Sequence, residues 1–462
     1  MKLDVLLTNG YIVKNETLKK YDIGIVGNKI QSVEEAGKFS YISEKTIDST
    51  GLFFLPGFID SHSHTDEAAL NDIFNSKLFQ GITSEICGNC GGSPAPINSE
   101  KTYKIRREVK SCEDNWYTHF RWMTFREYFK IANQKKLTCN HLYFVGLWTL
   151  YENSQSEQDL IILFENALES GCIGLSINQG HKSWTSLSVI TKRKIFEILK
   201  YHNKIFSVHL ANYSNDFMAN ISEIFTFIKK YRVKIVYSHI KFYNPTTNIN
   251  YNYFTEIFDQ TCFYTEARFD LYPFDSICTR LSSILNNSNN QLGGIKQIKI
   301  LSNGANIQTV NGKIIPKDRA YLEHLLNKSD LLVSANGINQ NTMFKLLANK
   351  HSFIGSDYSS FKICKNSLKT NHERGYSSFL KSFKLLMNAN YSLESTISKL
   401  SYNPAIFYNI KNRGKILRNY YADIIICNIT DDYDLCIEQI LVNGKIAYDK
   451  KSTSIIKHGN IL

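Results

Sequence analysis

Two histidines at the end of a short apolar stretch constrain this chain more than any other feature. The stretch covers residues 52–59, is interrupted only by Pro56 and Gly57, and leads to His62 and His64. Residues i and i+2 of a strand point to the same face, so these two imidazoles can reach one metal ion. We therefore interpret the stretch as a buried strand whose carboxyl end carries two metal ligands.

A repeating order of helices and strands follows this stretch. The clearest unit is an amphipathic helix over 157–170, closed by Gly171 and followed by an apolar strand over 173–176. Two further pairs join helices over 191–202 and 221–231 to strands over 205–208 and 234–237. Such alternation is typical of parallel βα units. We predict an α/β fold with a (β/α)8 barrel over 56–410, whose active site lies at the carboxyl ends of the strands.

Both ends of the chain have a different pattern, with short apolar strands separated by turns. Residues 1–55 contain hairpin-type turns at Asn9-Gly10 and Gly27-Asn28, and residues 411–462 contain one at Asn443-Gly444. Neither end is long enough for a hydrophobic core of its own. We therefore expect the two ends to combine into one small β-sandwich domain beside the barrel.

Two insertions interrupt the barrel pattern, near residues 97–135 and near residues 280–345. The first is rich in charged and aromatic residues, and the second contains the polar run 286–290. Long insertions in compact domains often form lids or binding elements. We expect such a lid here.

Charge and composition limit the possible partners. The formal net charge is +12, but the lysines are spread along the chain without a nucleic-acid-binding motif, which favours a solvated basic surface over nucleic-acid binding. Residues 1–10 have no long apolar segment, so no signal peptide is expected, and no run approaches the length of a membrane span. Ten cysteines without a disulfide-type spacing favour a reducing cytoplasm.

Cys87 and Cys90 have the C-x-x-C spacing of redox proteins. They follow a strand-like segment, however, and do not open a helix, which is where a thioredoxin-type thiol has its lowered pKa. We therefore favour Cys90 as a metal thiolate over a redox role, and we interpret Cys87 as structural.

Further polar residues also follow strand-like segments, as active-site residues of a barrel should. They are His209, His239, Tyr272 and Asp357. A thiolate from Cys90 with the imidazoles of His209 and His239 suits Zn²⁺. Three protein ligands leave a fourth position open, which a catalytic zinc site requires.

The order of these motifs resembles the amidohydrolase superfamily, whose first barrel strand ends in His-x-His. More narrowly, the chain resembles the D-aminoacylase (N-acyl-D-amino-acid deacylase) family. The residues that carry this likeness are Gly81-Ile82-Thr83, Gly88-Asn89-Cys90-Gly91 and Ser93-Pro94-Ala95-Pro96. The resemblance extends over nearly the whole chain and implies the same barrel with a terminal β-sandwich.

The resemblance also implies a metal centre. One tightly bound Zn²⁺ would be held by Cys90, His209 and His239. His62 and His64, with Asp357, would form an adjacent position, and the sequence leaves open whether a second metal binds there. Many amidohydrolases bridge two metals with a carboxylated lysine at the end of the fourth strand. The matching segment 172–177 contains no lysine, which favours the cysteine-containing branch.

The implied reaction is hydrolysis of an amide. Zn²⁺ lowers the pKa of a bound water and polarises the amide carbonyl, while Asp357 takes a proton from the attacking water and gives it to the leaving amine. The substrate would be an N-acyl amino acid, whose carboxylate needs cationic partners. By resemblance, Lys241, Tyr272 and Arg374 bind this carboxylate. The alternatives are a turn aspartate at 357 and ordinary surface charges at 241 and 374.

The chain departs from the family around the substrate pocket. Where the family reads His-x-Arg-x-Glu after the fifth strand, this chain has Ala211 and Tyr213. The polar residues of the family's Gly-His-Gly-x-x-Arg region are absent from 145–151, the loop 274–278 is not rich in serine and threonine, and Glu373 replaces a proline. These changes leave the substrate open.

Three hypotheses follow. The first is a zinc hydrolase that removes the acyl group from an N-acyl-D-amino acid or a close relative. The second is another amidohydrolase that acts on a different amide or a cyclic amide, and the altered loops are its support. The third is a barrel that kept its fold and lost catalysis, supported only by the changes at 211 and 213. A panel of N-acetyl amino acids and hydantoins separates the first two, and retention of stoichiometric zinc argues against the third.

Overall fold

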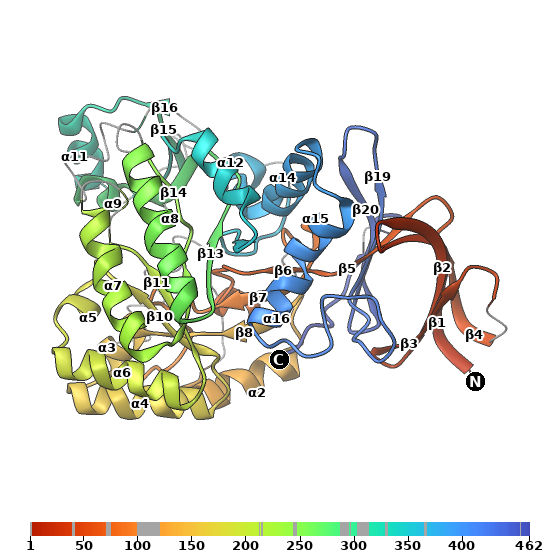
Figure 1. Cartoon of the computed structure of the whole chain (residues 1–462), viewed down its shortest axis with the longest axis horizontal. Coiled ribbons are helices and arrows are strands. Elements are labelled where there is room, and N and C mark those ends of the chain that lie inside the picture. Colours follow the sequence, from red (N-terminus) through yellow and green to blue (C-terminus); the bar gives the residue numbers. More distant parts are fainter. Residues whose placement is uncertain are drawn as a thin grey trace.

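The computed structural model comprises a barrel and, beside it, a curved β-sheet at the end of the molecule that holds the N-terminus (Figure 1). It describes residues 2–38, 42–70, 75–98, 121–211, 213, 216–243, 247–286, 295, 297–302, 314–328, 331–364, 367–452 and 454–462. None of the helices in these ranges combines the length and the apolar composition needed to cross a membrane.

The terminal sheet contains strands from both ends of the chain, which confirms the predicted β-domain. Its nine strands are hydrogen-bonded into one mixed sheet, in the order β22-β21-β20-β19-β5-β1-β2-β3, with β4 paired to β1. The N-terminal strands are β1 (Lys2–Lys14), β2 (Thr17–Val26), β3 (Lys29–Glu35), β4 (Ile42–Asp48) and β5 (Phe53–Pro56). The C-terminal strands are β19 (Ile424–Ile429), β20 (Leu435–Val442), β21 (Lys445–Asp449) and β22 (Ser454–Ile455).

Strand β19 joins the two hydrophobic cores because its side chains alternate between faces. Ile424 and Ile426 pack with Leu7 in the core of the terminal sheet. Ile425 and Cys427 belong to the large core that also covers the barrel. The sheet is therefore an integral part of the barrel's packing.

The turn expected at Asn9-Gly10 is wrong. Asn9 lies inside β1, where the register with β2 shifts between Leu7 and Gly10, and its backbone N–H donates to Asp22 Oδ1 at 2.8 Å. This is a β-bulge, a feature that needs the same residue types as a turn. The hairpin turn lies at Asn15 and Glu16, both at positive φ. The turns at Gly27-Asn28 and Asn443-Gly444 are confirmed, since Val26 pairs with Lys29 and Val442 pairs with Lys445.

The single strand expected over 52–59 is also wrong, because it is two strands in two sheets. β5 ends at Pro56 and pairs with β19 of the terminal sheet, whereas β6 (Phe58–Asp60) pairs with β7 of the barrel. Gly57 joins them, and its N–H donates to Asp423 O at 2.8 Å. A Cβ atom at Gly57 would lie 2.0 Å from Thr83 Oγ1, so only glycine fits this crossing point.

The barrel has the parallel strands that the sequence predicts. They are β6, β7 (Ile82–Cys87), β8 (Asn140–Tyr143) continued by β9 (Val145–Gly146), β10 (Gly174–Asn178), β11 (Ile205–His209), β12 (Lys234–Tyr237), β13 (Ala267–Leu271) and β18 (Ser352–Ile354). Backbone hydrogen bonds close the ring where the sheets are interrupted. Ser61 N donates to Ile354 O at 3.0 Å, and Ile173 N donates to Tyr143 O at 2.8 Å.

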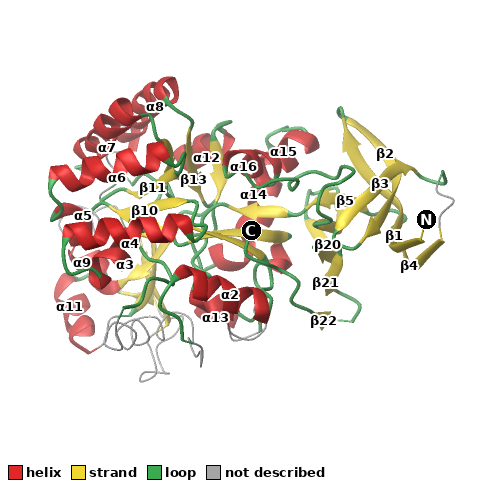
Figure 2. Ribbon diagram, turned by 90° about the horizontal axis from the view of Figure 1, so that it is seen from below, coloured by secondary structure: helices red, strands yellow, loops and turns green. Residues whose placement is uncertain are grey.

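Helices surround these strands, and Figure 2 shows them on the outside of the barrel. The three helices expected near 157–170, 191–202 and 221–231 are confirmed as α4 (Glu157–Glu169), α6 (Val189–Tyr201) and α7 (Phe217–Tyr231). The others of the barrel are α2 (Phe125–Lys135), α3 (Leu147–Asn153), α5 (Lys182–Thr185), α8 (Thr247–Tyr264), α12 (Gln340–Ala348), α13 (Ser367–Thr370), α14 (Arg374–Asn388), α15 (Leu393–Leu400) and α16 (Tyr402–Phe407). Short 3₁₀ helices lie at η1 (Glu67–Leu70) and η2 (Leu78–Gln80).

The second insertion forms a small sheet of its own. Its strands are β14 (Ser276–Arg280), β15 (Gln297–Ser302), β16 (Ile314–Ile315) and β17 (Leu332–Asn336), accompanied by α9 (Leu281–Asn286) and α11 (Arg319–Lys328). The expected insertion 280–345 therefore begins slightly earlier, at β14. Much of the expected polar run 286–290, and residues 99–120 of the first insertion, lie outside the described residues.

Candidate metal centre and active site

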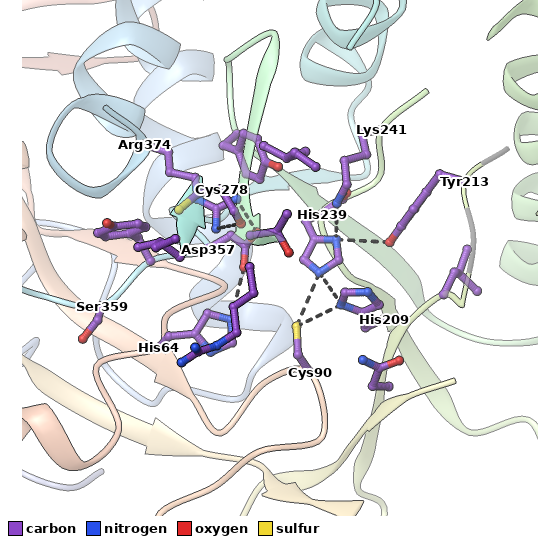
Figure 3. A pocket seen from close by; sticks show the side chains of 18 of the residues that line it. His64, Cys90, His209, Tyr213, His239, Lys241, Cys278, Asp357, Ser359 and Arg374 are labelled. Atoms are coloured by element: carbon purple, nitrogen blue, oxygen red, sulfur yellow. Dashed lines mark hydrogen bonds and ion pairs between the residues drawn. The ribbon is translucent and has the colours of Figure 1, made fainter. Parts of the chain in front are cut away.

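One cysteine and two histidines meet at the carboxyl end of the barrel (Figure 3). Cys90 Sγ lies 3.4 Å from His209 Nδ1 and 3.4 Å from His239 Nε2, and these two nitrogens are 2.9 Å apart. His62 Nε2 lies on another side of the sulfur, at 3.3 Å. The structure thus brings together residues that are up to 177 positions apart in the sequence, between His62 and His239.

The backbone places each of these side chains. His209 is the last residue of β11, and His239 follows β12. Cys90 lies in a tight turn after β7, where Gly88, Cys90 and Gly91 all have positive φ. A Cβ atom at Gly88 would lie 2.0 Å from Phe144 O, so glycine is required there. This requirement explains the first glycine of the Gly-Asn-Cys-Gly sequence around the sulfur.

The donor atoms fit a tetrahedral metal ion. Around a zinc ion with Zn–S of about 2.3 Å and Zn–N of about 2.0–2.1 Å, neighbouring ligand atoms are separated by roughly 3.3–3.6 Å. The observed Sγ–N separations of 3.4 Å match this spacing, and the 2.9 Å between the two nitrogens is shorter by a few tenths. The set of one thiolate and two imidazoles is also chemically suited to zinc.

The electrostatics of Cys90 agree with a thiolate. Burial would raise the pKa of this thiol, but the surrounding imidazoles of His62, His239 and His209 outweigh burial and hold its pKa well below the ordinary value. The metal-binding form of cysteine is the thiolate. The imidazoles around Cys90 therefore favour the thiolate form that binds metal.

Asp270 and Tyr213 orient two of the histidines, and neither role is predicted from the sequence. Asp270 is fully buried on β13, where Oδ2 lies 3.2 Å from His62 Nδ1 and Oδ1 accepts a hydrogen bond from the backbone N–H of His239 at 2.9 Å. The hydroxyl of Tyr213 lies 3.1 Å from His239 Nδ1 and 2.9 Å from Ser238 O. An acidic residue inside an apolar strand was the available signal for Asp270.

Asp357 lies beside this cluster, after β18, with its backbone at φ +49°. Its Oδ1 is 3.1 Å from His64 Nε2 and 3.6 Å from His62 Nε2, and its Oδ2 is 2.8 Å from Arg374 Nη1. Burial opposes ionisation, but the Arg374 guanidinium and the nearby histidines hold the pKa of Asp357 well below its ordinary value. The carboxylate is therefore ionised at neutral pH.

A pocket of about 390 Å³ opens over these groups. The predicted site residues that line it are His64, Cys90, His209, His239, Asp357, Lys241, Tyr272 and Arg374. His62 does not line the pocket and is fully buried, with its Nε2 3.3 Å from Cys90 Sγ. Every candidate site residue therefore lines the pocket or contacts a residue that does.

The cationic side chains of the pocket are held by aromatic rings. Lys241 Nζ lies 4.5 Å from the centroid of the Tyr213 ring and 2.9 Å from His239 Nδ1. The Arg374 guanidinium lies 4.9 Å from the centroid of the Tyr272 ring, and its Nη2 donates to Cys278 O at 3.2 Å. Arg374 Nε is buried without a hydrogen-bond partner among the described residues.

The insertion sheet supplies a wall of the same pocket. Residues 277–280 of β14 and Leu332 of β17 line it, together with Tyr243. Arg280 adds a further positive charge to this wall. The insertion therefore contributes directly to the space in which a substrate would lie.

Comparison with models of protein families matches residues 185–457 to the amidohydrolase family. The chain belongs to this family. This amidohydrolase is 22% identical to the N-acyl-D-aspartate deacylase of Alcaligenes xylosoxydans xylosoxydans, over 96% of its own length and 91% of that relative. It is also 27% identical to the D-aminoacylase of the same organism, over 52% of this chain and 50% of that one.

The amidohydrolase shares its fold with solved structures of two such enzymes. The crystal structure of a D-aminoacylase superposes with a TM-score of 0.82 at 20% identity, covering 100% of this chain and 99% of the other. An N-acyl-D-glutamate deacylase from Bordetella bronchiseptica, solved with zinc and a phosphonate inhibitor, superposes with a TM-score of 0.81 at 19% identity, covering 100% of both chains. The predicted barrel with a terminal β-domain is thereby confirmed.

Proposed function

We propose that this amidohydrolase is a zinc-dependent hydrolase that removes the acyl group from N-acyl-D-amino acids or close relatives. The observation that carries the proposal is one pocket that Cys90, His209, His239 and Asp357 line together with the cationic groups Lys241 and Arg374. The full-length relatives act on N-acyl-D-amino acids by name, and they supply the substrate class.

In this proposal Cys90, His209 and His239 hold the zinc, and His62 with His64 and Asp357 forms an adjacent position for a second, weaker ion. A bound zinc ion would lower the pKa of a water and polarise the carbonyl of the scissile amide. The tyrosine and aspartate next to the histidines keep the rings in a fixed orientation, as partners of metal ligands commonly do.

Asp357 would act as the general base and then the general acid. Its Oδ2 is bound by Arg374, so its Oδ1, which faces His64 and His62, is the oxygen available to take a proton from the attacking water. The same oxygen would give the proton to the nitrogen of the leaving amine. In this proposal Asp357 lies beside the ligand cluster, so one carboxylate can reach both the attacking water and the leaving nitrogen.

Lys241, Tyr272 and Arg374 would bind the carboxylate of the amino acid. All three line the pocket, and the two cations provide the charge-assisted hydrogen bonds that carboxylates favour. Arg280 and Leu332, on the insertion wall, would contact the side chain or the acyl group. Ala211 and Tyr213 also line this pocket, so the departures from the family pattern lie where they can alter substrate preference.

The test combines metal analysis of the purified chain with ninhydrin detection of amine released from N-acetyl-D- and N-acetyl-L-amino acids, beside a panel of hydantoins. About one zinc per chain with release from D substrates supports the proposal. Zinc with turnover of hydantoins alone supports the alternative of another amidohydrolase. If the protein holds no zinc after incubation with zinc and removal of the unbound zinc by dialysis, the metal centre is rejected.

A further inference from the structure

A fully buried lysine lies behind the active site, outside the pocket. Lys77 immediately precedes η2, between β6 and β7, and its relative exposure is 0%. Its ammonium group donates hydrogen bonds to Asp60 Oδ2 at 2.7 Å, to Ser356 Oγ at 2.5 Å and to Tyr358 O at 2.9 Å. Since an ammonium group has three N–H donors, these acceptors use all of them.

Asp60 extends this network to two barrel strands. Its Oδ1 accepts hydrogen bonds from the backbone N–H groups of His62 at 3.2 Å and Ser356 at 2.9 Å. Its Oδ2 accepts from the Ser356 hydroxyl at 2.6 Å as well as from Lys77. The buried Lys77–Asp60 pair therefore joins the end of β6, which carries His62, to the end of β18, which carries Asp357.

The segment held in this way has an unfavourable backbone conformation at its centre. Asp357 has φ +49°, in the left-handed region that residues other than glycine seldom occupy. Lys77 binds the side chain of the residue before it and the carbonyl of the residue after it. The N–H of Asp357 donates to His62 O at 2.8 Å. Such a conformation persists only when the surroundings over-determine it.

We propose that Lys77 is a positioning residue, which through Asp60 and Ser356 holds the backbone of Asp357 so that its carboxylate faces the metal-ligand cluster. This inference rests on the proposed function, because it takes Asp357 as the carboxylate that transfers the proton. Lys77 does not line the pocket, so it acts only through these partners.

Glu85 is a second acidic residue beside Lys77. Its contacts favour a positioning role for this buried cluster over a second metal site. Glu85, Cys87 and His141 lie close enough to share an ion, but the two nitrogens of His141 face different partners. Nε2 is 3.5 Å from Glu85 Oε1, whereas Nδ1 is 3.6 Å from Cys87 Sγ. Lys77 Nζ, 3.6 Å from Glu85 Oε2, already supplies a positive charge there. Glu85 in turn accepts from Ser63 Oγ at 2.5 Å and Thr65 Oγ1 at 2.6 Å, which anchors the loop between His62 and His64.

The test uses the double variant Lys77→Met/Asp60→Asn in the full chain, because Lys77→Met alone leaves a buried carboxylate unpaired. The matched control is Lys399→Met. Lys399 is also buried and lies at the other end of β18, where it donates to Asn349 O at 2.6 Å and Ser352 O at 3.2 Å. The measurements are kcat per bound zinc, KM, and hydrogen–deuterium exchange of a peptide that contains Ser356 and Asp357.

We expect kcat per zinc to fall roughly 10- to 100-fold in the double variant, as for other residues that orient an active site, with little change in KM. Exchange at Ser356 and Asp357 should become faster than in the rest of the barrel. The Lys399→Met control should keep the wild-type kcat per zinc and the wild-type exchange at these two amides.

Unchanged exchange at Ser356 and Asp357, or a wild-type kcat per zinc in the double variant, would overturn the inference. So would an increase in exchange spread evenly over the barrel, because that indicates general destabilisation. If the wild-type chain hydrolyses no N-acyl amino acid, the proposed function fails. The exchange measurement still decides in that case whether Lys77 holds the Asp357 segment.

Discussion

Arg374 Nη1 lies 2.8 Å from Asp357 Oδ2, so a cation assigned here to substrate binding is paired with the carboxylate assigned to proton transfer. A substrate carboxylate that accepts hydrogen bonds from Arg374 would compete with Asp357 for the positive charge of the guanidinium group. The pKa of Asp357 would then rise, and the carboxylate would become a stronger base when substrate is present. Binding and basicity are linked through one guanidinium group.

This pair predicts a pH effect of Arg374→Met. The guanidinium is the largest charge interaction that lowers the pKa of Asp357, so its removal raises that pKa. Asp357 must be ionised to act as a base, and the acid limb of kcat/KM against pH should therefore move to higher pH. Arg319→Met, which alters an exposed ion pair with Glu323, is the control and should leave the profile in place. An acid limb that stays fixed in Arg374→Met contradicts the pairing.

Asp357→Asn tests the proton-transfer role directly. The amide keeps the shape of the side chain but cannot take the proton from water, so kcat should fall by roughly 10²–10⁴-fold. Zinc content after dialysis should stay at the wild-type level, since the tight site is assigned to Cys90, His209 and His239. A kcat near that of the wild type would remove Asp357 from the mechanism.

Cys90→Ser and Cys87→Ser separate the two cysteines of the C-x-x-C run. Cys90 Sγ lies among three imidazole nitrogens, whereas the buried Cys87 Sγ is 3.6 Å from His141 Nδ1. A serine hydroxyl is a much poorer zinc ligand than a thiolate, so Cys90→Ser should lose zinc on dialysis while Cys87→Ser keeps it. Equal loss of zinc in both variants would mean that the run acts as a unit.

Lys241→Met should raise KM for an N-acyl amino acid with a smaller effect on kcat. A hydrogen bond to a charged group is worth about 1.5–3 kcal/mol, which corresponds to roughly a 10- to 100-fold change in KM. Lys384→Met, on an exposed ion pair with Asp434, is the matched control. Zinc content needs to be measured in parallel, because Lys241 Nζ also contacts His239 Nδ1 at 2.9 Å. An unchanged KM would place the substrate carboxylate elsewhere.

Lys399 predicts a pH dependence of stability that is unrelated to the active site. Burial lowers the pKa of this lysine from 10.5 to about 7 in the folded chain. Between these two values the unfolded chain binds more protons than the folded chain, so the contribution of Lys399 to stability increases as the pH rises through that range. The increase should be smaller in Lys399→Met, as measured by denaturant midpoints at several pH values. A variant with the same slope as the wild type would contradict the lowered pKa.

The barrel was predictable because its signals are local. Helices such as α4 and α6 carry their own apolar spacing, and each is capped by a serine, Ser156 and Ser188, whose side chain accepts a backbone N–H. The candidate ligands could be found because each one follows a strand-like segment. Parallel strands bring their carboxyl ends to one side of a barrel whatever their separation in the sequence.

What the sequence did not reveal depends on partners that are distant in the chain. Asp270 and Lys77 are buried polar residues whose hydrogen-bond partners come from other segments of the chain. The sequence can show that Asp270 is an acidic residue in an apolar strand, but no local pattern shows which groups it binds. Asn9 has the residue type of a turn, but the carboxylate of Asp22 holds it in a bulge. The predicted strand over 52–59 is two strands, because the chain leaves one sheet and enters another at Pro56 and Gly57. Tertiary packing determines where this change of sheet occurs.

The pairing of β5 with β19 has a consequence for biosynthesis. Leu55 pairs with Ile425, about 370 residues later in the chain. At about 5–20 residues per second, a ribosome needs roughly 20–70 s to make that partner. During this interval the apolar strand β5 has an open edge, and an open edge can pair with other chains. The edge of β5 that β19 covers in the folded protein therefore stays without this partner until the C-terminal strands have been made.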